Sequence, residues 1–121
     1  MDGPVNLSEK FALFSQTWTP KIIGAVDGYH VKIAKIEGEF VWHVHEDADE
    51  LFLVVGGQLR LKFRDRGDVL LRPGELFVVP KGIEHLPVAE PEARIVMIER
   101  QGTVNTGTSG GERTVAAPEW I

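Results

Sequence analysis

The sequence predicts an all-β fold, an antiparallel sandwich or barrel with one short helix near its start. From about Lys21 onward, short β-branched and aromatic runs are separated by turn residues at the spacing typical of sandwiches and barrels. The 121 residues amount to about one ordinary domain. The 43% hydrophobic and 26% charged residues are typical of a soluble globular protein and argue against a disordered, collagen-like or membrane protein.

Both ends of the chain are expected to lie outside the barrel. We predict a helix and arm over residues 1–20, the barrel over 21–100 and a glycine-rich tail without regular structure over 101–121. Leu7, Phe11 and Phe14 recur at the spacing of one helical face, with Asn6 or Ser8 as the capping residue, so this helix should pack on the barrel's flank. The tail ends in Trp120-Ile121, which could instead dock on a neighbour; the sequence leaves this open.

Four turn sequences divide the predicted strands. Asp27-Gly28, Gly56-Gly57 and Asp65-Arg66-Gly67 each stand between two strand-like runs and have the chemistry of tight hairpins. Pro80-Lys81-Gly82 predicts a further tight turn between the runs ELFVV and IEHLPVA. The connectivity is therefore expected to be mostly antiparallel.

The strand-like runs differ in how many faces they bury. In QLRLKFR, apolar residues alternate with basic ones, so one face is buried and the other is wet. ELFLVV is apolar on both faces, so Leu51, Leu53 and Val55 need cover from the N-terminal helix, another strand layer or a second subunit. We predict a homodimer on this basis.

Charge and cysteine content narrow the classes of partner and site. Acidic residues outnumber basic ones by 18 to 13 and no basic cluster suits nucleic acid or an anionic membrane, so the expected partner is a small molecule. The absence of cysteine excludes thiolate ligands and disulfides and favours a cytoplasmic location. The chain opens without a signal-peptide pattern and contains no run of about 18 apolar residues, so neither export nor membrane spanning is indicated.

His43 and His45 are the first candidate metal ligands. They stand two residues apart in the run FVWHVH, so on a strand their side chains share one face with Cα atoms roughly 7 Å apart. Two imidazoles at that spacing can lean toward one ion, with metal–nitrogen distances of about 2.1 Å. Taken alone, the pair fits a metal site and a pair of core histidines about equally well.

Glu50 strengthens the metal interpretation. The acidic stretch from Glu46 to Asp49 reads as a solvated turn, which folds Glu50 back beside the histidines and onto the face of Phe52 and Val54. A buried carboxylate without a partner costs several kcal/mol, and a neighbouring cation removes that cost. The alternative is that Glu50 caps the strand in solvent or pairs with a lysine.

His85 completes the predicted ligand set. The turn Pro80-Lys81-Gly82 delivers it near the start of the next strand, among apolar residues. Any single histidine of this kind is explained equally by a core imidazole bonded to a backbone carbonyl. Together, the residues favour one divalent transition-metal ion, Mn, Fe, Ni or Zn, which these ligand types do not discriminate. The predicted ligands are His43, His45, Glu50 and His85.

The stretch from Gly38 to Ala89 resembles the two signature motifs of the cupin superfamily. The first motif is formed by Gly38, His43-Val44-His45, Glu50 and Gly57; the second by Gly74, Pro80-Lys81-Gly82 and His85. The resemblance implies a double-stranded β-helix, or jelly-roll, barrel and the same four ligands. Gly38 stands one residue closer to His43 than is usual, and Ala89 replaces a frequent asparagine; neither departure touches a ligand.

The resemblance is closest to small single-domain bacterial cupins, some loosely labelled mannose-6-phosphate isomerase-like. It implies a metalloenzyme of the dioxygenase or isomerase type acting on an unidentified small molecule. The alternative is a non-catalytic module that binds a sugar or an acid, and a third reading is a structural barrel with core histidines. The fold does not choose among the activities of its members.

A few other residues have expected roles. His30 has no partner at ligand spacing and is expected to be a surface or strand histidine. Lys32 and Lys35 face opposite sides of one strand, so one points inward; it is expected to snorkel out at the strand end rather than neutralise an anionic substrate. Glu84 or that lysine could act as general base only if it faces the cavity. The expected pocket walls are Val41, Phe52, Val54, Leu61 and Phe63.

Overall fold

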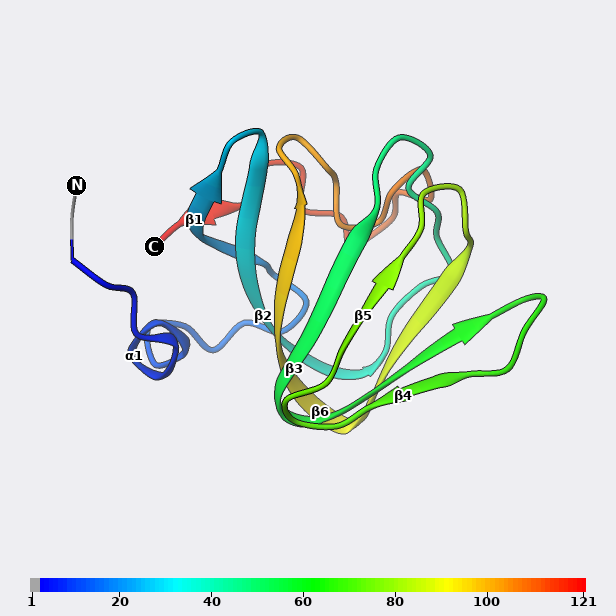
Figure 1. Cartoon of the computed structure of the whole chain (residues 1–121), viewed down its shortest axis with the longest axis horizontal. Coiled ribbons are helices and arrows are strands. Elements are labelled where there is room, and N and C mark those ends of the chain that lie inside the picture. Colours follow the sequence, from blue (N-terminus) through cyan, green and yellow to red (C-terminus); the bar gives the residue numbers. More distant parts are fainter. Residues whose placement is uncertain (1–2) are drawn as a thin grey trace.

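The computed structural model describes residues 3–121, and its regular secondary structure is almost entirely β-strand (Figure 1). The elements are α1 (Leu7–Phe11), β1 (Lys21–Val26), β2 (Tyr29–Glu39), β3 (Glu50–Phe63), β4 (Val69–Leu71), β5 (Leu76–Val79), β6 (His85–Arg100) and β7 (Glu119–Trp120). The predicted fold class, an all-β barrel with one short N-terminal helix, is confirmed. Within the described residues, no helix is long and apolar enough to cross a membrane.

The strands form one curled sheet in the order β4-β3-β6-β2-β1-β7, with β5 pairing with β3. The two longest strands, β3 and β6, are antiparallel neighbours over their whole length. Their register places Glu50 opposite Glu99 at one end and Phe63 opposite His85 at the other. Because side chains alternate along a strand, this register decides which residues of β3 and β6 face each other inside the barrel.

The predicted hairpin at Gly56-Gly57 is wrong. Strand β3 continues through both glycines with a register shift on each side, and its first half pairs with β5 while its second half pairs with β4. Gly57 has a φ of 74°, and a Cβ atom there would overlap the carbonyl oxygen of Glu92 on β6. The two glycines therefore bend one strand instead of reversing the chain.

The other predicted turns are present. Asp27-Gly28 joins β1 to β2, with Val26 opposite Tyr29, and the segment after Phe63 joins β3 to its antiparallel neighbour β4. Pro80-Lys81-Gly82 lies between β5 and β6. The connectivity around the barrel is therefore mostly antiparallel, as expected; β1 and β7 pair in parallel.

Apolar side chains pack on both sides of the sheet. The larger cluster fills the barrel and includes Phe52, Leu61 and Ile95. A second cluster lies between α1 and the outside of the sheet, where Phe11 meets Ile33 and Val96, with Leu53 and Val55 at its margin. The helix begins at the predicted cap, since the Asn6 side chain accepts a hydrogen bond from the Glu9 amide (2.9 Å). The helix thus covers Leu53 and Val55, which are part of the outward-facing apolar row of β3.

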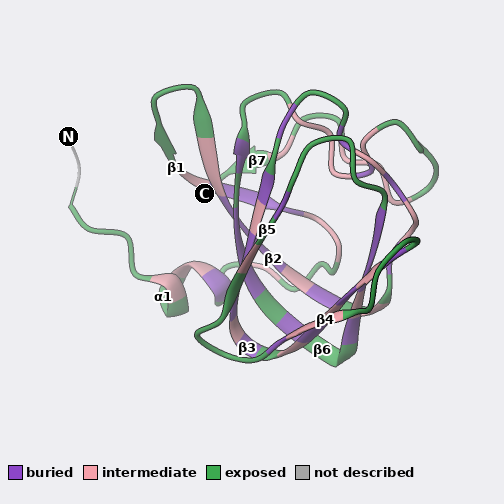
Figure 2. Cartoon of the chain, turned by 45° about the vertical axis from the view of Figure 1, so that its right-hand side comes forward, coloured by how far each residue is buried: buried purple, intermediate pink, exposed green. Residues whose placement is uncertain are grey.

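The segment after β6 has little regular secondary structure, but it packs against the rest of the chain. Its backbone crosses one end of the barrel (Figure 1), and its Thr106 is fully buried. Figure 2 shows buried stretches along the strands, whereas the N-terminal arm and the tip of the β1–β2 hairpin are exposed. Farther on, β7 pairs in parallel with β1, and the Ile121 amide donates to the Ile22 carbonyl (3.0 Å). The ring of Trp120 meets His30 edge-on within the same chain. Sequence patterning misses this packing because a chain of turns has no hydrophobic period.

Candidate metal centre

Three different parts of the chain bring the predicted ligands together. His43 and His45 come from the connection between β2 and β3, Glu50 is the first residue of β3, and His85 is the first residue of β6. The histidine pair does not lie on a regular strand: His43 forms only an isolated bridge, exchanging backbone hydrogen bonds with His85 at 3.0 and 2.9 Å. That bridge is enough to hold the extended connection against the start of β6.

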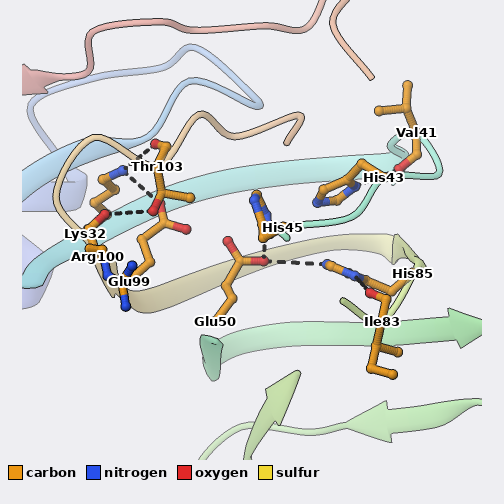
Figure 3. Close-up of polar contacts among 10 residues, drawn as sticks. All are labelled: Lys32, Val41, His43, His45, Glu50, Ile83, His85, Glu99, Arg100 and Thr103. Atoms are coloured by element: carbon orange, nitrogen blue, oxygen red, sulfur yellow. Dashed lines mark hydrogen bonds and ion pairs between the residues drawn. The ribbon is translucent and has the colours of Figure 1, made fainter. Parts of the chain in front are cut away.

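The four side chains converge on one point inside the barrel. One potential ligand atom from each residue lies within 4.8 Å of the others, and all four residues are buried. The Nε2 atoms of His45 and His85 are each 3.4 Å from Oε1 of Glu50 (Figure 3). Two donors that are each about 2.1 Å from one ion stand about 3.0 to 3.4 Å apart at right or tetrahedral angles, so the spacing fits a shared ion.

The hydrogen bonding of the cluster also fits a metal. His45 Nε2, Glu50 Oε1 and His85 Nε2 are buried without a hydrogen-bond partner. Nδ1 of His43 is 2.8 Å from the Val41 carbonyl, and Nδ1 of His85 is 2.9 Å from the Ile83 carbonyl. A carbonyl only accepts, so each Nδ1 carries the proton and each Nε2 presents its lone pair to the centre. These residues could therefore hold a divalent ion.

Electrostatics favours the protonation states that bind metal. Burial, followed by the nearby His85, lowers the pKa of His43 to about 4, so its imidazole is neutral at physiological pH. Burial raises the pKa of Glu50, but the neighbouring Glu99, His45 and His85 side chains outweigh burial and hold this pKa well below its usual range. The centre thus combines a neutral imidazole with an ionised carboxylate.

Nearby polar residues lie outside the centre. Glu46 and Asp47 are exposed, and Asp49 accepts a hydrogen bond from the Lys81 amide (2.9 Å), as expected for a solvated turn. Glu84 is exposed and pairs with Arg64, so it does not face the cavity as a general base would. His30 lies away from the cluster.

A cavity opens beside the centre, with about 420 Å³ of empty space that includes its open mouth. Of the five predicted wall residues, only Phe52 lines it; Leu61 and Phe63 belong to the packed core instead. Trp18 from the N-terminal arm and Asn105 from the C-terminal segment also line it, and sequence reasoning missed both. The full lining is Trp18, Pro20, Ala34, Ile36, Phe40, His43, Glu50, Phe52, Pro87, Ile95, Met97, Glu99 and Asn105.

The inward lysine is Lys32, and its expected snorkelling is wrong. Its side chain is buried and its Nζ lies 2.7 Å from Oε1 of Glu99, a residue that the sequence reasoning did not single out. Burial, followed by the Glu50 carboxylate, raises the pKa of Glu99 well above its usual range. Strand parity was the available signal, because Glu99 shares its face with Met97 and Lys32 shares its face with Ala34.

Comparisons with known proteins agree with this architecture. A solved structure of a cupin-2 domain containing protein from Shewanella frigidimarina is 46% identical, with a TM-score of 0.78 over 80% of this chain and 94% of that one. The uncharacterized protein YdbB of Bacillus subtilis is 34% identical over 105 residues, which are 78% of this chain and 87% of YdbB.

Similarity to an enzyme of known name is more local. The 3-hydroxyanthranilate 3,4-dioxygenase of Bos taurus is 33% identical over 63 residues, which are 50% of this chain but only 22% of the bovine protein. The family model described as the cupin domain matches residues 29–99, which contain all four residues of the cluster. The fold, the four converging side chains and this match together place the chain in the cupin family, with its jelly-roll barrel.

Proposed function

We propose that the protein is a metal-dependent enzyme of the dioxygenase or isomerase type that acts on a small molecule. The observation that carries the proposal is the set of buried donor atoms without partners, His45 Nε2, Glu50 Oε1 and His85 Nε2. Burying such atoms is costly unless a ligand satisfies them. A divalent cation satisfies all three at once.

The chain's own residues prepare the centre for chemistry. A divalent ion bound to four protein ligands would supply Lewis acidity and further coordination positions for a substrate oxygen or dioxygen. Backbone carbonyls hold the rings of His43 and His85 in place, and the mainly apolar walls, such as Phe52 and Met97, keep water away from a bound substrate. Mn, Fe, Ni and Zn all suit this set of ligands.

Metal content of protein purified without an affinity tag tests the central claim. We expect about one transition-metal ion per chain in the wild type and a loss of most of it in His43→Ala, whereas His30→Ala, a histidine substitution outside the cluster, keeps it. Elemental analysis makes the measurement. A wild type with far less than one ion per chain, or a His43→Ala variant with wild-type metal content, would sink the proposal.

Within this proposal, the dioxygenase type is favoured by the similarity to the bovine dioxygenase. Oxygen uptake distinguishes the two types, since an isomerase consumes no oxygen. We expect uptake when metal-loaded protein is screened with catechols, enediols and diketones, and none with His43→Ala. Conversion of a substrate without oxygen consumption would instead support the isomerase type.

A non-catalytic module for a sugar or an acid is the second candidate. It is favoured by the exposure of Glu84, which removes one of the two general bases considered from the sequence. A binding module would show stabilisation by a ligand without turnover, whereas an enzyme would release product.

We also propose that two copies of the chain pair through the outside of the sheet. Leu76 and Val78 on β5 are 56% and 43% exposed, and Ile98 on β6 is 37% exposed. Leu51 on β3 lies between them in the register, opposite both Val78 and Ile98. We call these four residues the outer apolar patch. They continue the outward-facing apolar row of β3 beyond the part that α1 covers.

A further inference from the structure

The connection that carries His43 and His45 is extended, but a strand pairs with it on one edge only. Backbone carbonyls of successive residues in an extended chain point to opposite edges. On one edge, His43 exchanges backbone hydrogen bonds of 3.0 and 2.9 Å with His85 at the start of β6. The carbonyls of Trp42 and Val44 face the other edge, where no strand of the described chain pairs with the connection. Another part of the chain must fix that edge.

The segment after β6 lies against this second edge (Figure 1). We call its residues 103–115 the C-terminal strap. Ser109 Oγ donates a hydrogen bond to the Trp42 carbonyl (2.7 Å). Gly107 has a φ of 56°, and a Cβ atom there would overlap the Val44 carbonyl oxygen and lie 3.4 Å from Nδ1 of His45. The strap thus touches the connection at the residues on either side of His43.

The C-terminal strap is itself held in shape by side-chain hydrogen bonds. The Asn105 side chain accepts from the Val115 amide (2.8 Å) and donates to the Arg113 carbonyl (2.7 Å). Oγ1 of the fully buried Thr106 lies 2.7 Å from Oγ1 of Thr114. These contacts tie the two halves of the strap together, so it forms a compact loop without a helix or strand. Such a loop can hold a neighbouring segment in place.

His45 has the most to gain from this support. Nδ1 of His43 and Nδ1 of His85 each donate to a backbone carbonyl of their own segment. Within residues 3–121, no such bond fixes Nδ1 of His45. The direction of its ring therefore depends on its backbone and on the atoms packed around it, and Gly107 lies next to its Nδ1.

We propose that Gly107 and Ser109 are positioning residues of the metal centre. Through these two residues the C-terminal strap fixes the backbone of residues 42–45, and with it the direction of the His45 ring. The inference rests on the proposed function, because it assigns the strap a role in holding the ion. The family match ends at Glu99, so this support comes from a segment outside the matched barrel.

Gly107→Ala tests this role, with Gly110→Ala as its matched control. Gly110 lies in the same strap with a φ of 66°, so alanine is strained there too, but its Cβ atom would meet nothing within 4 Å. Competition with a coloured chelator gives the zinc affinity of each protein at a temperature at which all are folded. We expect the zinc dissociation constant to rise about tenfold or more in Gly107→Ala and to stay at the wild-type value in Gly110→Ala.

The visible absorption of bound cobalt(II) separates positioning from a general loss of stability. These absorption bands depend on the number and arrangement of the ligands, whereas a fold that is only less stable leaves them unchanged. We expect the wild type and Gly110→Ala to share one spectrum, and Gly107→Ala to differ in the position or intensity of the bands. A wild-type spectrum or a wild-type zinc affinity in Gly107→Ala overturns the inference.

Ser109→Ala is the milder variant, and it decides the outcome if Gly107→Ala does not fold. It removes the hydrogen bond to the Trp42 carbonyl and adds no atom. We expect the zinc dissociation constant to rise about threefold. Thr108→Ala, which removes the hydroxyl group of the exposed neighbouring residue, should leave it unchanged. Equal zinc affinities of Ser109→Ala and Thr108→Ala would count against the strap.

The outcomes separate this inference from the proposed function. A wild type that takes up neither zinc nor cobalt refutes both. A wild type that binds one ion per chain, with variants of Gly107 and Ser109 that bind it equally well, refutes only the role of the C-terminal strap.

Discussion

His43 and His85 are oriented by the same kind of hydrogen bond to the backbone. Each ring donates its Nδ1 proton to the backbone carbonyl two positions earlier, Val41 for His43 and Ile83 for His85. An imidazole whose Nδ1 is fixed in this way keeps its tautomer and its direction without help from an ion. The centre is therefore preorganised in the folded chain. The free energy needed to bury and align these groups is part of the free energy of folding, so metal binding does not have to supply it.

One consequence is a pH dependence of stability in the metal-free protein. The pKa of His43 falls from an ordinary 6.5 to about 4 on folding, so between these values the unfolded chain binds the extra proton. Stability is then complete above about pH 6.5 and decreases as the pH falls toward 4, by about 3 kcal/mol from this residue. Urea unfolding of chelator-treated protein at several pH values measures the change.

The matched variant for this prediction is His43→Gln, which cannot take up the proton. Its stability should fall less steeply over the same pH window. Equal slopes for the wild type and His43→Gln would contradict the assignment of this titration to His43.

At this scale, the cluster could be predicted from the sequence, but its surroundings could not. The two-residue spacing of His43 and His45 and the turn before His85 are local signals, so these residues were found. The contact between Lys32 and Glu99 joins residues far apart in the chain, and it depends on the register of β2 and β6. Strand parity indicates which side chains point inward, but not which inward side chains meet.

Among the elements, β3 connects the candidate metal centre to the core of the barrel. One strand supplies Glu50 at its start and core residues at its end, and it changes partner from β5 to β4 at its bend. The glycine pair was misassigned as a hairpin because glycine pairs are common both in tight turns and where a strand bends under a close neighbour. Only the position of β6 against Gly57 decides between them.

Gly57→Ala tests this explanation. The added Cβ would meet the Glu92 carbonyl, and alanine is strained at a φ of 74°, so we expect the free energy of unfolding to fall by about 3 kcal/mol or more. Gly67→Ala is the control, because a Cβ there meets nothing within 4 Å. Urea unfolding compares the two. A Gly57→Ala variant as stable as Gly67→Ala would mean that β3 does not pass β6 as described.

On the scale of the whole molecule, metal binding and folding are linked. An ion that binds only the folded chain stabilises it by about 2.7 kcal/mol when its free concentration is a hundred times its dissociation constant. We therefore expect a chelator to lower the melting temperature of the metal-loaded wild type. The metal-free wild type and His85→Ala should show no such drop, and a drop in His85→Ala would place the ion elsewhere.

The predicted homodimer is also a question for the whole molecule. Val78→Asp places a charge in the outer apolar patch, so it should convert a dimer into monomers in light scattering at micromolar concentration. Val26→Asp makes the same substitution at an exposed valine of β1, outside the patch, and should leave the mass unchanged. A monomeric wild type, or a dimer that survives Val78→Asp, would count against pairing through this face.

The cavity is lined partly by residues inside the family match and partly by residues outside it. The family match ends at Glu99, and all four members of the cluster lie within it, but Trp18, Pro20 and Asn105 lie outside. Relatives can thus keep the four-residue cluster and still differ in the segments that supply the rest of the cavity lining. Sequence similarity across the barrel alone therefore indicates a shared set of metal ligands. A shared substrate is best sought among proteins that also match in the arm before β1 and the loops after β6.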